Sequence, residues 1–340
     1  MRVSVVIPSY NRAKLLLETI PTYLQEDVIE VIIVDDASVD NTAEVVKKIQ
    51  EKYPQVKYIR NAVNKKQTYS KNIGIKISKG DYIYLGDDDS ILMPNSIRYL
   101  KETMYKYNAD ICGAKALYLP MEYVNKIDEY VQLNDIQLVD KNEIVDIKKI
   151  KASFNYSTAL PIVVPFCQAC ALVKKELAIQ ILFDENFTGN AYREETDFFI
   201  RCTLQGAKVM YDSRAVQVNL PRQVATGGAH SRGRIKWYLS TIANNWYFLK
   251  KNWKNIQSYY KFSDNIYKRQ LMFVLKNICF VLPVQHLHNC PIFVFYYNHL
   301  NSTYTIFFYS ALSICLVLQD FLHIPIILIY LFHSVPLILK

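Results

Sequence analysis

The N-terminal third of the chain alternates short apolar runs with segments whose apolar residues recur at helical spacing. Runs rich in Val, Ile and Tyr predict strands that are buried on both faces, and the segments between them predict amphipathic helices. The predicted strands are residues 3–7, 30–34, 56–60 and 82–86, and the predicted helices begin near residue 13, after the N-cap Asp40, and at Tyr69. This alternation favours an α/β fold with a mostly parallel sheet, flanking helices and right-handed crossovers.

Three consecutive carboxylates, Asp87, Asp88 and Asp89, follow the fourth predicted strand. Unpaired ionised side chains are costly to bury, so carboxylates at this point do not belong to the core. In open α/β sheets, ligands bind at the carboxyl ends of the strands. Two carboxylates at positions i and i+2 can hold a hard divalent cation, which can bridge the phosphates of a nucleotide. The alternative is an acidic surface loop, but the position directly after a buried strand favours a ligand site.

Other common chemistries find little support in the sequence. No G-x-G-x-x-G or Walker-type loop occurs, which argues against a dinucleotide enzyme and a P-loop ATPase. Cys167 and Cys170 form a C-x-x-C pair within an apolar segment, residues 162–173, that predicts a strand, and no second pair lies nearby at zinc spacing. Buried free thiols are the favoured interpretation, and the odd count of 7 cysteines fits a reducing compartment.

A set of short motifs lies along the chain at residues 5–12, 34–42, 72–75, 80–89, 182–185 and 194–201. They include V-V-I-P-S-Y-N-R, V-D-D-A-S-V-D-N-T, L-F-D-E and E-E-T-D-F-F-I-R. Together, in order and spacing, they resemble the family 2 glycosyltransferases over roughly residues 1–255. That resemblance implies the GT-A fold, which is a Rossmann-like sheet flanked by helices, and a transfer that inverts the anomeric carbon.

The resemblance implies a UDP-, GDP- or dTDP-sugar donor and a divalent metal, Mn²⁺ or Mg²⁺, which would stabilise the departing diphosphate. Asp87 and Asp89 match the D-x-D metal motif, with Asp89 expected as the direct ligand and Asp87 able to reach the ribose or a metal-bound water. Asp36 is expected to accept a hydrogen bond from the base. Arg12 and Lys71 carry charges that suit the diphosphate, and the alternative is that both are solvated surface residues. The predicted donor-binding residues are Pro8, Tyr10, Arg12, Asp36, Ser38, Lys71, Asp87 and Asp88.

An inverting transfer needs a general base that takes the proton from the acceptor hydroxyl. The resemblance places this base at Glu195, where most family members have Asp, and Asp197 is the alternative. The longer side chain shifts the carboxylate by about one methylene, and misplaced catalytic groups lose rate steeply. Acidic residues that open a helix are also ordinary capping and dipole partners. A second departure is Asn219, where many members carry a His that His230 could partly replace.

The last third of the chain is first basic and then almost free of charge. Residues 214–340 hold 13 Lys and Arg against two acidic residues. The basic residues gather at 232–276 among Trp and Tyr, a pattern typical of nucleic-acid binding or of an anionic membrane surface. No nucleic-acid-binding fold is evident, and the apolar stretches 292–297, 304–318 and 321–339 favour the membrane. The alternative is a buried C-terminal helical domain or an oligomer interface.

These observations predict a GT-A domain at residues 1–255 and a hydrophobic, helical, membrane-associating region at residues 256–340. Within the first, residues 1–116 would bind the donor, 117–160 form an insertion, and 161–255 form the acceptor half with the base. The predicted function is a metal-dependent glycosyltransferase of the hexosyltransferase type, with a membrane-linked or glycan acceptor. It would work at the cytoplasmic face of the cell membrane, in polysaccharide or glycolipid biosynthesis. The alternative is a catalytically weak, membrane-anchored scaffold that binds sugar nucleotides, which only the departure at Glu195 favours.

Overall fold

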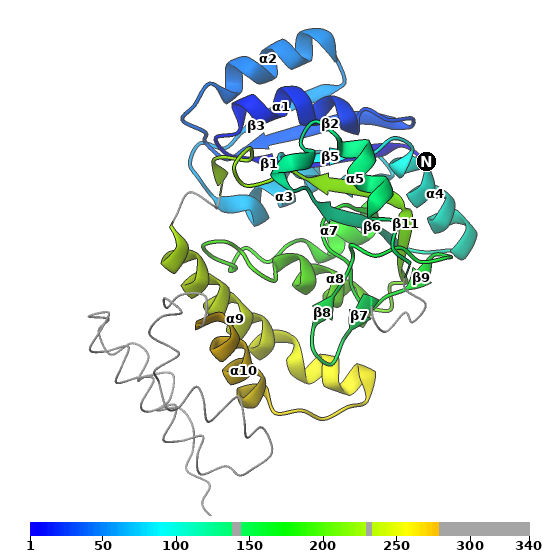
Figure 1. The fold of residues 1–340 in the computed structure, drawn as a ribbon, viewed down its shortest axis with the longest axis vertical. Coiled ribbons are helices and arrows are strands. Elements are labelled where there is room, and N and C mark those ends of the chain that lie inside the picture. Colours follow the sequence, from blue (N-terminus) through cyan, green and yellow to red (C-terminus); the bar gives the residue numbers. More distant parts are fainter. Residues whose placement is uncertain (138–143, 229–232, 279–340) are drawn as a thin grey trace, which may run out of the picture. The chain divides into compact units, whose positions relative to one another are not determined.

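The computed structural model describes residues 1–137, 144–228 and 233–278. Within these residues nine strands form one sheet, in the order β3-β2-β1-β4-β10-β6-β11-β5, with β9 paired to β11 (Figure 1). The α/β class is therefore confirmed. The strands are β1 (Val3–Ser9), β2 (Val28–Asp35), β3 (Val56–Arg60), β4 (Tyr82–Leu85), β5 (Ser90–Leu92), β6 (Ile111–Tyr118), β9 (Ile162–Val163), β10 (Ala171–Lys174) and β11 (Val209–Asn219).

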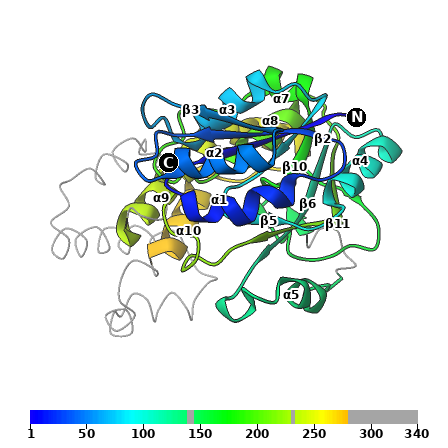
Figure 2. The same cartoon turned by 90° about the horizontal axis from the view of Figure 1, so that it is seen from above.

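Helices cover both faces of this sheet because its strands are apolar on both sides. Along β1, Val3, Val5 and Ile7 pack under α1, α2 and α4, whereas Val6 faces the core beneath α3, α7, α8 and α9. Figure 2 views the chain from the side of α1 and α2. The helices are α1 (Ala13–Thr19), η1 (Ile20–Tyr23), α2 (Thr42–Lys52), α3 (Lys66–Ile77), α4 (Ser96–Tyr107), η2 (Met121–Tyr123), α5 (Ile127–Leu133), α7 (Lys175–Ile181), α8 (Glu194–Leu204), α9 (Arg234–Tyr260) and α10 (Ile266–Ile278).

The four strands predicted in the N-terminal third are present and parallel to one another. Strand β1 continues through Pro8 to Ser9, two residues beyond the predicted strand 3–7, which ends just before the proline. Alternate residues of a strand direct their backbone groups to opposite neighbours. The carbonyl of Ser9 accepts a hydrogen bond from the backbone N–H of Asp36, just after β2, so the backbone of Pro8 faces β4 instead. The pairing between β1 and β4 ends before this point, at Val6 and Leu85. Proline is tolerated there because no partner strand needs its donor.

The second half of the sheet is mixed, so the prediction of a mostly parallel sheet is wrong beyond β4. Strand β10 inserts between β4 and β6 and is antiparallel to both, and β5 is antiparallel to β11. The strand predicted at residues 162–173 is two short strands, β9 and β10, separated by residues 164–170. Cys170 ends this connection with φ +62°, a conformation that breaks a continuous strand.

The C-terminal part of the described chain is helical. Met1–Asn277 form one compact unit, and the boundary predicted at residue 255 falls inside α9. The described part of the basic zone lies in α9, in α10 and in the turn between them. A membrane-spanning helix, which must be both long and apolar, is not found among the described residues. The apolar stretches after residue 290 lie outside the described residues. The insertion holds η2, α5 and a small sheet of β7 (Val145–Asp146) and β8 (Lys151–Ala152). The described cysteines are buried free thiols, as predicted, namely Cys112, Cys167, Cys170 and Cys202.

Candidate active site

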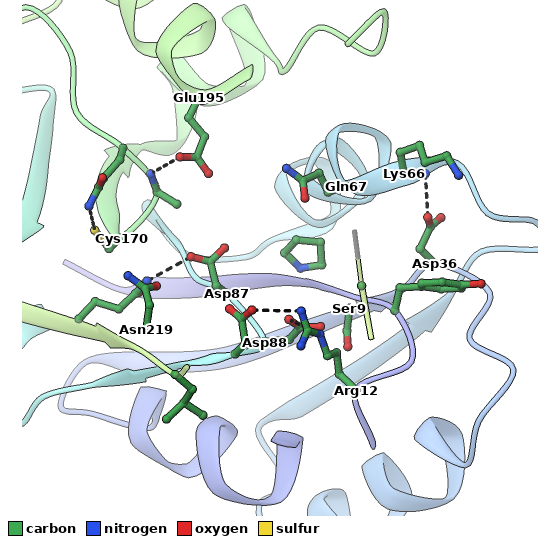
Figure 3. Close-up of a pocket in the computed structure, with 18 of the residues that line it drawn as sticks. Ser9, Arg12, Asp36, Lys66, Gln67, Asp87, Asp88, Cys170, Glu195 and Asn219 are labelled. Carbon is green, nitrogen blue, oxygen red and sulfur yellow. Dashed lines mark hydrogen bonds and ion pairs between the residues drawn. The ribbon is translucent and has the colours of Figure 1, made fainter. Parts of the chain in front are cut away.

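A pocket of about 420 Å³ opens where the carboxyl ends of β1, β2, β4, β6 and β11 come together. Asp36 lies at one end of the pocket and Asn219 at the other, with Asp87 and Asp88 between them (Figure 3). Glu195 projects from the opposite wall. The structure thus brings together side chains far apart in sequence, and the predicted site residues in the lining are Pro8, Tyr10, Arg12, Asp36, Asp87, Asp88, Asp89 and Glu195.

At one end of the pocket, Asp36 fixes the loop between β3 and α3. Its carboxylate accepts hydrogen bonds from the backbone N–H of Lys65 and of Lys66, each at 2.7 Å, and from the amide of Asn61 at 2.9 Å. The side chain is buried, so most of its acceptor capacity is used inside the protein. Ser38 does not line the pocket. Its hydroxyl accepts a hydrogen bond from the backbone N–H of Asn11 at 2.8 Å.

Arg12 is buried beside the aspartates, so the interpretation of it as a solvated surface residue is wrong. Its Nη2 lies 3.1 Å from Asp89 Oδ2, its Nε lies 3.6 Å from Asp88 Oδ1, and its Nη1 donates to the carbonyl of Thr226. Gly228 packs against the guanidinium, and an added Cβ there would approach Nη2 to 2.7 Å. Arg12 lines the pocket, but its charge is directed at the aspartates.

The aspartates concentrate more negative charge than the neighbouring cations neutralise. Burial, followed by the negative charge of Glu195, raises the pKa of Asp87 to about 8. Burial, followed by the charge of Asp89, raises the pKa of Asp88 to about 7. The Asp87 carboxylate accepts the amide of Gln217 at 3.1 Å.

These carboxylates fit a hard divalent cation, because oxygen donors and uncompensated charge are what such an ion requires. Among the described residues, no group of three or more His, Cys, Asp or Glu side chains is arranged to hold a metal. Further ligands would therefore come from a bound molecule or from water.

We expect Asp87→Asn to stabilise the metal-free protein at high pH. Because folding raises the pKa of Asp87, its contribution to stability is fully present below about pH 4 and is lost as pH rises toward 8. The gain in free energy of unfolding over wild type should grow from pH 4 to pH 8 and reach about 1–3 kcal/mol. Urea unfolding of both proteins across this range is the measurement, and a gain that is absent at pH 8 would contradict the assigned charge state.

Glu195, in the first turn of α8, is the carboxylate of the opposite wall. Its side chain is 27% exposed, Oε1 lies 3.0 Å from the Lys71 ammonium, and Oε2 accepts the backbone N–H of Ala169 at 2.9 Å. Lys71 itself is 2% exposed and lies outside the lining, so the solvated-surface interpretation is wrong for it too.

Asp197 is fully buried on the side of α8 that faces α9 and does not reach the pocket. Its carboxylate pairs with Arg201 at 2.8 Å and Lys251 at 2.9 Å, and it accepts the amide of Asn252 at 2.8 Å. The contacts with Lys251 and Asn252 join α8 to α9, so the position of Asp197 gives it a structural role.

Several lining residues were missed by the sequence analysis. Arg222 is exposed at the pocket and lies over the ring of Trp237 at 5.7 Å, and Tyr118 and Gln217 also line the site. Tyr118 and Arg222 could have been found in the same way as the aspartates, because they lie at or just after the carboxyl ends of β6 and β11.

Asn219, the second departure from the family pattern, accepts a hydrogen bond from the Ser90 hydroxyl and donates one to the carbonyl of Leu117. His230 lies outside the described residues.

The mixed sheet, its flanking helices and the acidic pocket at the strand ends define an α/β protein of the GT-A type. A family model described as glycosyl transferase family 2 matches residues 4–182, which is more than half of the chain. The chain therefore belongs to glycosyl transferase family 2.

Relatives with curated names agree with this family. The chain is 33% identical over 111 residues to the glycosyltransferase GlyG of Streptococcus pneumoniae. This match covers 32% of this chain and 37% of GlyG. It is 26% identical over 285 residues to an uncharacterised glycosyltransferase of Methanocaldococcus jannaschii, covering 80% and 85%. It is 31% identical over 116 residues to the GalNAc(5)-diNAcBac-PP-undecaprenol beta-1,3-glucosyltransferase of Campylobacter jejuni, covering 33% and 37%. The matches to the first and third of these proteins thus span little more than a third of their length.

Solved structures show the same fold. The mannosyltransferase PcManGT from Pyrobaculum calidifontis, in complex with GDP-Man and Mn²⁺, matches with a TM-score of 0.52 and 14% identity, covering 93% of this chain and 80% of that one. TarS of S. aureus, in complex with UDP-GlcNAc, matches with a TM-score of 0.52 and 15% identity, covering 82% and 73%.

Proposed function

We propose that this protein is a metal-dependent glycosyltransferase that moves a sugar, with inversion, from a nucleotide-sugar donor to a glycan or lipid-linked acceptor. The observation that carries the proposal is that one pocket has carboxylates on facing walls, Asp87 to Asp89 after β4 and Glu195 at the start of α8. The first group suits a metal-bound diphosphate, and the second suits removal of a proton. Two structural neighbours, TarS in complex with UDP-GlcNAc and PcManGT in complex with GDP-Man and Mn²⁺, support the donor class and the metal.

In this proposal Asp87 and Asp89 would hold Mn²⁺ or Mg²⁺, and the bound cation supplies positive charge that favours departure of the diphosphate. Arg12 keeps Asp88 and Asp89 in place by pairing with both carboxylates. Arg222, an exposed residue that lines the pocket, offers the leaving diphosphate a further positive charge.

Glu195 would act as the general base. As the acceptor hydroxyl oxygen bonds to the anomeric carbon, the bond from that carbon to the diphosphate oxygen breaks, and the diphosphate leaves with the bonding electrons. The hydroxyl proton passes to the Glu195 carboxylate, whose oxygens each accept one protein hydrogen bond and keep further acceptor capacity. The alternative function, a catalytically weak scaffold, rests only on Glu in place of Asp, and the presence of Glu195 in the lining favours catalysis.

At the other end of the pocket, Pro8, Tyr10 and Asp36 would surround the base of the nucleotide. Asp36 would act mainly by fixing the loop that forms the wall, because its oxygens already accept two backbone N–H groups. The test of the whole proposal is hydrolysis of a panel of donors, UDP-glucose, UDP-N-acetylglucosamine and GDP-mannose, with Mn²⁺ or Mg²⁺. We expect at least one donor to be cleaved, and failure with all of them in both metals would contradict the proposal.

The C-terminal region is proposed to hold the enzyme at the cytoplasmic face of the membrane. Support comes from the basic, aromatic-rich α9 and α10, from the apolar sequence after them, and from the undecaprenol-linked substrate named for the Campylobacter jejuni relative. A chain that ends after Asn277, where the compact unit ends, should move from the membrane to the soluble fraction and still bind the donor. Cell fractionation with a nucleotide-binding assay is the measurement. A full-length chain that is soluble and monodisperse without detergent would contradict the anchor.

A further inference from the structure

Lys71, on α3, is buried at the point where α3 meets the two acids that open α8. Its Nζ lies 2.8 Å from Glu194 Oε1 and 3.0 Å from Glu195 Oε1, and 4.9 Å from the ring centre of Phe183. Burial alone would lower the pKa of Lys71, but the negative charges of Glu194 and Glu195 raise it above its ordinary value. A buried ammonium is retained in this way only when its charge is paired.

The second oxygen of Glu195 is held from another direction. Oε2 accepts the backbone N–H of Ala169 at 2.9 Å. The next residue, Cys170, donates its backbone N–H to the carbonyl of Leu85 at 2.8 Å, in the strand that leads directly into Asp87. The carboxylate of Glu195 is therefore tied on one side to α3 and on the other to the segment before β10, which in turn bonds to the end of β4, the strand that precedes the aspartates.

We infer that Lys71 is a positioning residue that, together with the Ala169 N–H, fixes the Glu195 carboxylate at the pocket, and that this clamp is what accommodates Glu where most of the family has Asp. The inference rests on the proposed function of Glu195 as the base. An aspartate is shorter by one methylene, so we expect it to lose at least one of these two contacts from the same backbone position. Lys71 lies behind the lining, so this role differs from the direct diphosphate contact predicted from the sequence.

The test compares Lys71→Met with wild type, using hydrolysis of whichever of UDP-glucose, UDP-N-acetylglucosamine and GDP-mannose the wild type cleaves fastest. We expect kcat to fall about 100-fold because the base loses its fixed position, while the donor KM changes less than about threefold. Lys76→Met, an exposed lysine on the same helix, is the matched control and should behave as wild type.

Three further variants keep the result interpretable if Lys71→Met alone is unstable. That change leaves Glu194 buried without its cation, so the double variant Lys71→Met with Glu194→Gln removes both charges and should melt close to wild type while keeping the loss of kcat. Lys71→Arg retains the charge and should recover part of the rate. Glu195→Asp, although it restores the family's common residue, should lose about tenfold or more in kcat.

Two outcomes overturn the inference. One is a kcat within about twofold of wild type for both the single and the double variant. The other is a large loss of donor affinity with kcat unchanged, which would make Lys71 a donor contact. Glu195→Gln, measured alongside, separates the two claims. If it cleaves donor at the wild-type rate, the proposed function has failed, whereas an inactive Glu195→Gln beside a fully active Lys71→Met rejects only the inference.

Discussion

Glu195→Gln is expected to lower turnover by about 10²- to 10⁴-fold while leaving donor affinity nearly unchanged. Glutamine keeps the size of the side chain, but its single amide oxygen can accept only one of the two hydrogen bonds, from the Ala169 N–H or from the Lys71 ammonium, and it cannot take a proton. Removal of a group that acts only in the transition state lowers kcat and kcat/KM by the same factor. Steady-state hydrolysis of the preferred donor, with calorimetry for nucleotide binding, measures both quantities.

Glu176→Gln is the matched control, because Glu176 also lies in the first turn of a helix but is exposed and outside the pocket. It should retain full activity. Asp197→Asn gives the decisive contrast, because it breaks the buried links to Arg201 and Lys251. We expect it to lower the melting temperature more than the rate per folded molecule. If the folded Asp197→Asn protein is inactive and Glu195→Gln is active, the base has been placed on the wrong side of α8.

Asp89→Asn is expected to reduce metal-dependent turnover by about 100-fold or more and to abolish the effect of metal on nucleotide binding. The substitution removes one oxygen charge from the proposed metal site but keeps the shape of the side chain. The fold should survive, because the side chain is 25% exposed and Arg12 keeps its contact with Asp88. Turnover across a Mn²⁺ titration, with the melting temperature as a check of folding, measures the effect.

The control for this variant is Asp128→Asn, an exposed carboxylate in the first turn of α5. It removes the same charge from the chain and should leave both turnover and metal response unchanged. Full activity of Asp89→Asn at ordinary metal concentrations would remove the D-x-D assignment. The same loss in both variants would point to an effect of overall charge.

The parts of this protein that could be predicted are those that local sequence determines. Four strands and the acidic turn after β4 follow from apolar runs and their stop signals. The antiparallel insertion of β10 between β4 and β6 could not be predicted, because it depends on pairings between segments that are distant in the chain. The extension of β1 through Pro8 could not be predicted for a related reason. Whether a proline ends a strand depends on which neighbour its missing donor faces, and that is known only once the sheet is assembled.

The site shows the same division. Asp87, Asp88, Asp89 and Glu195 line one pocket, as expected for the aspartates from their place after a strand and for Glu195 from the family resemblance. Asp197 could have been set aside from the sequence, because residues two apart on a helix lie about 200° apart around its axis and face different neighbours. Lys71 could not be placed in this way, because its role depends on how α3 packs against the start of α8.

Metal-dependent sugar transfer is tested most directly by the rate of nucleotide-sugar hydrolysis by the protein in Mn²⁺ and in EDTA, measured with the fastest donor of the panel. We expect hydrolysis in Mn²⁺ that falls about 100-fold or more in EDTA and returns when Mn²⁺ is added back in excess. Glu195→Gln should remain slow in both conditions. Equal rates in Mn²⁺ and EDTA, or no cleavage of any donor by the wild type, would contradict a metal-dependent glycosyltransferase.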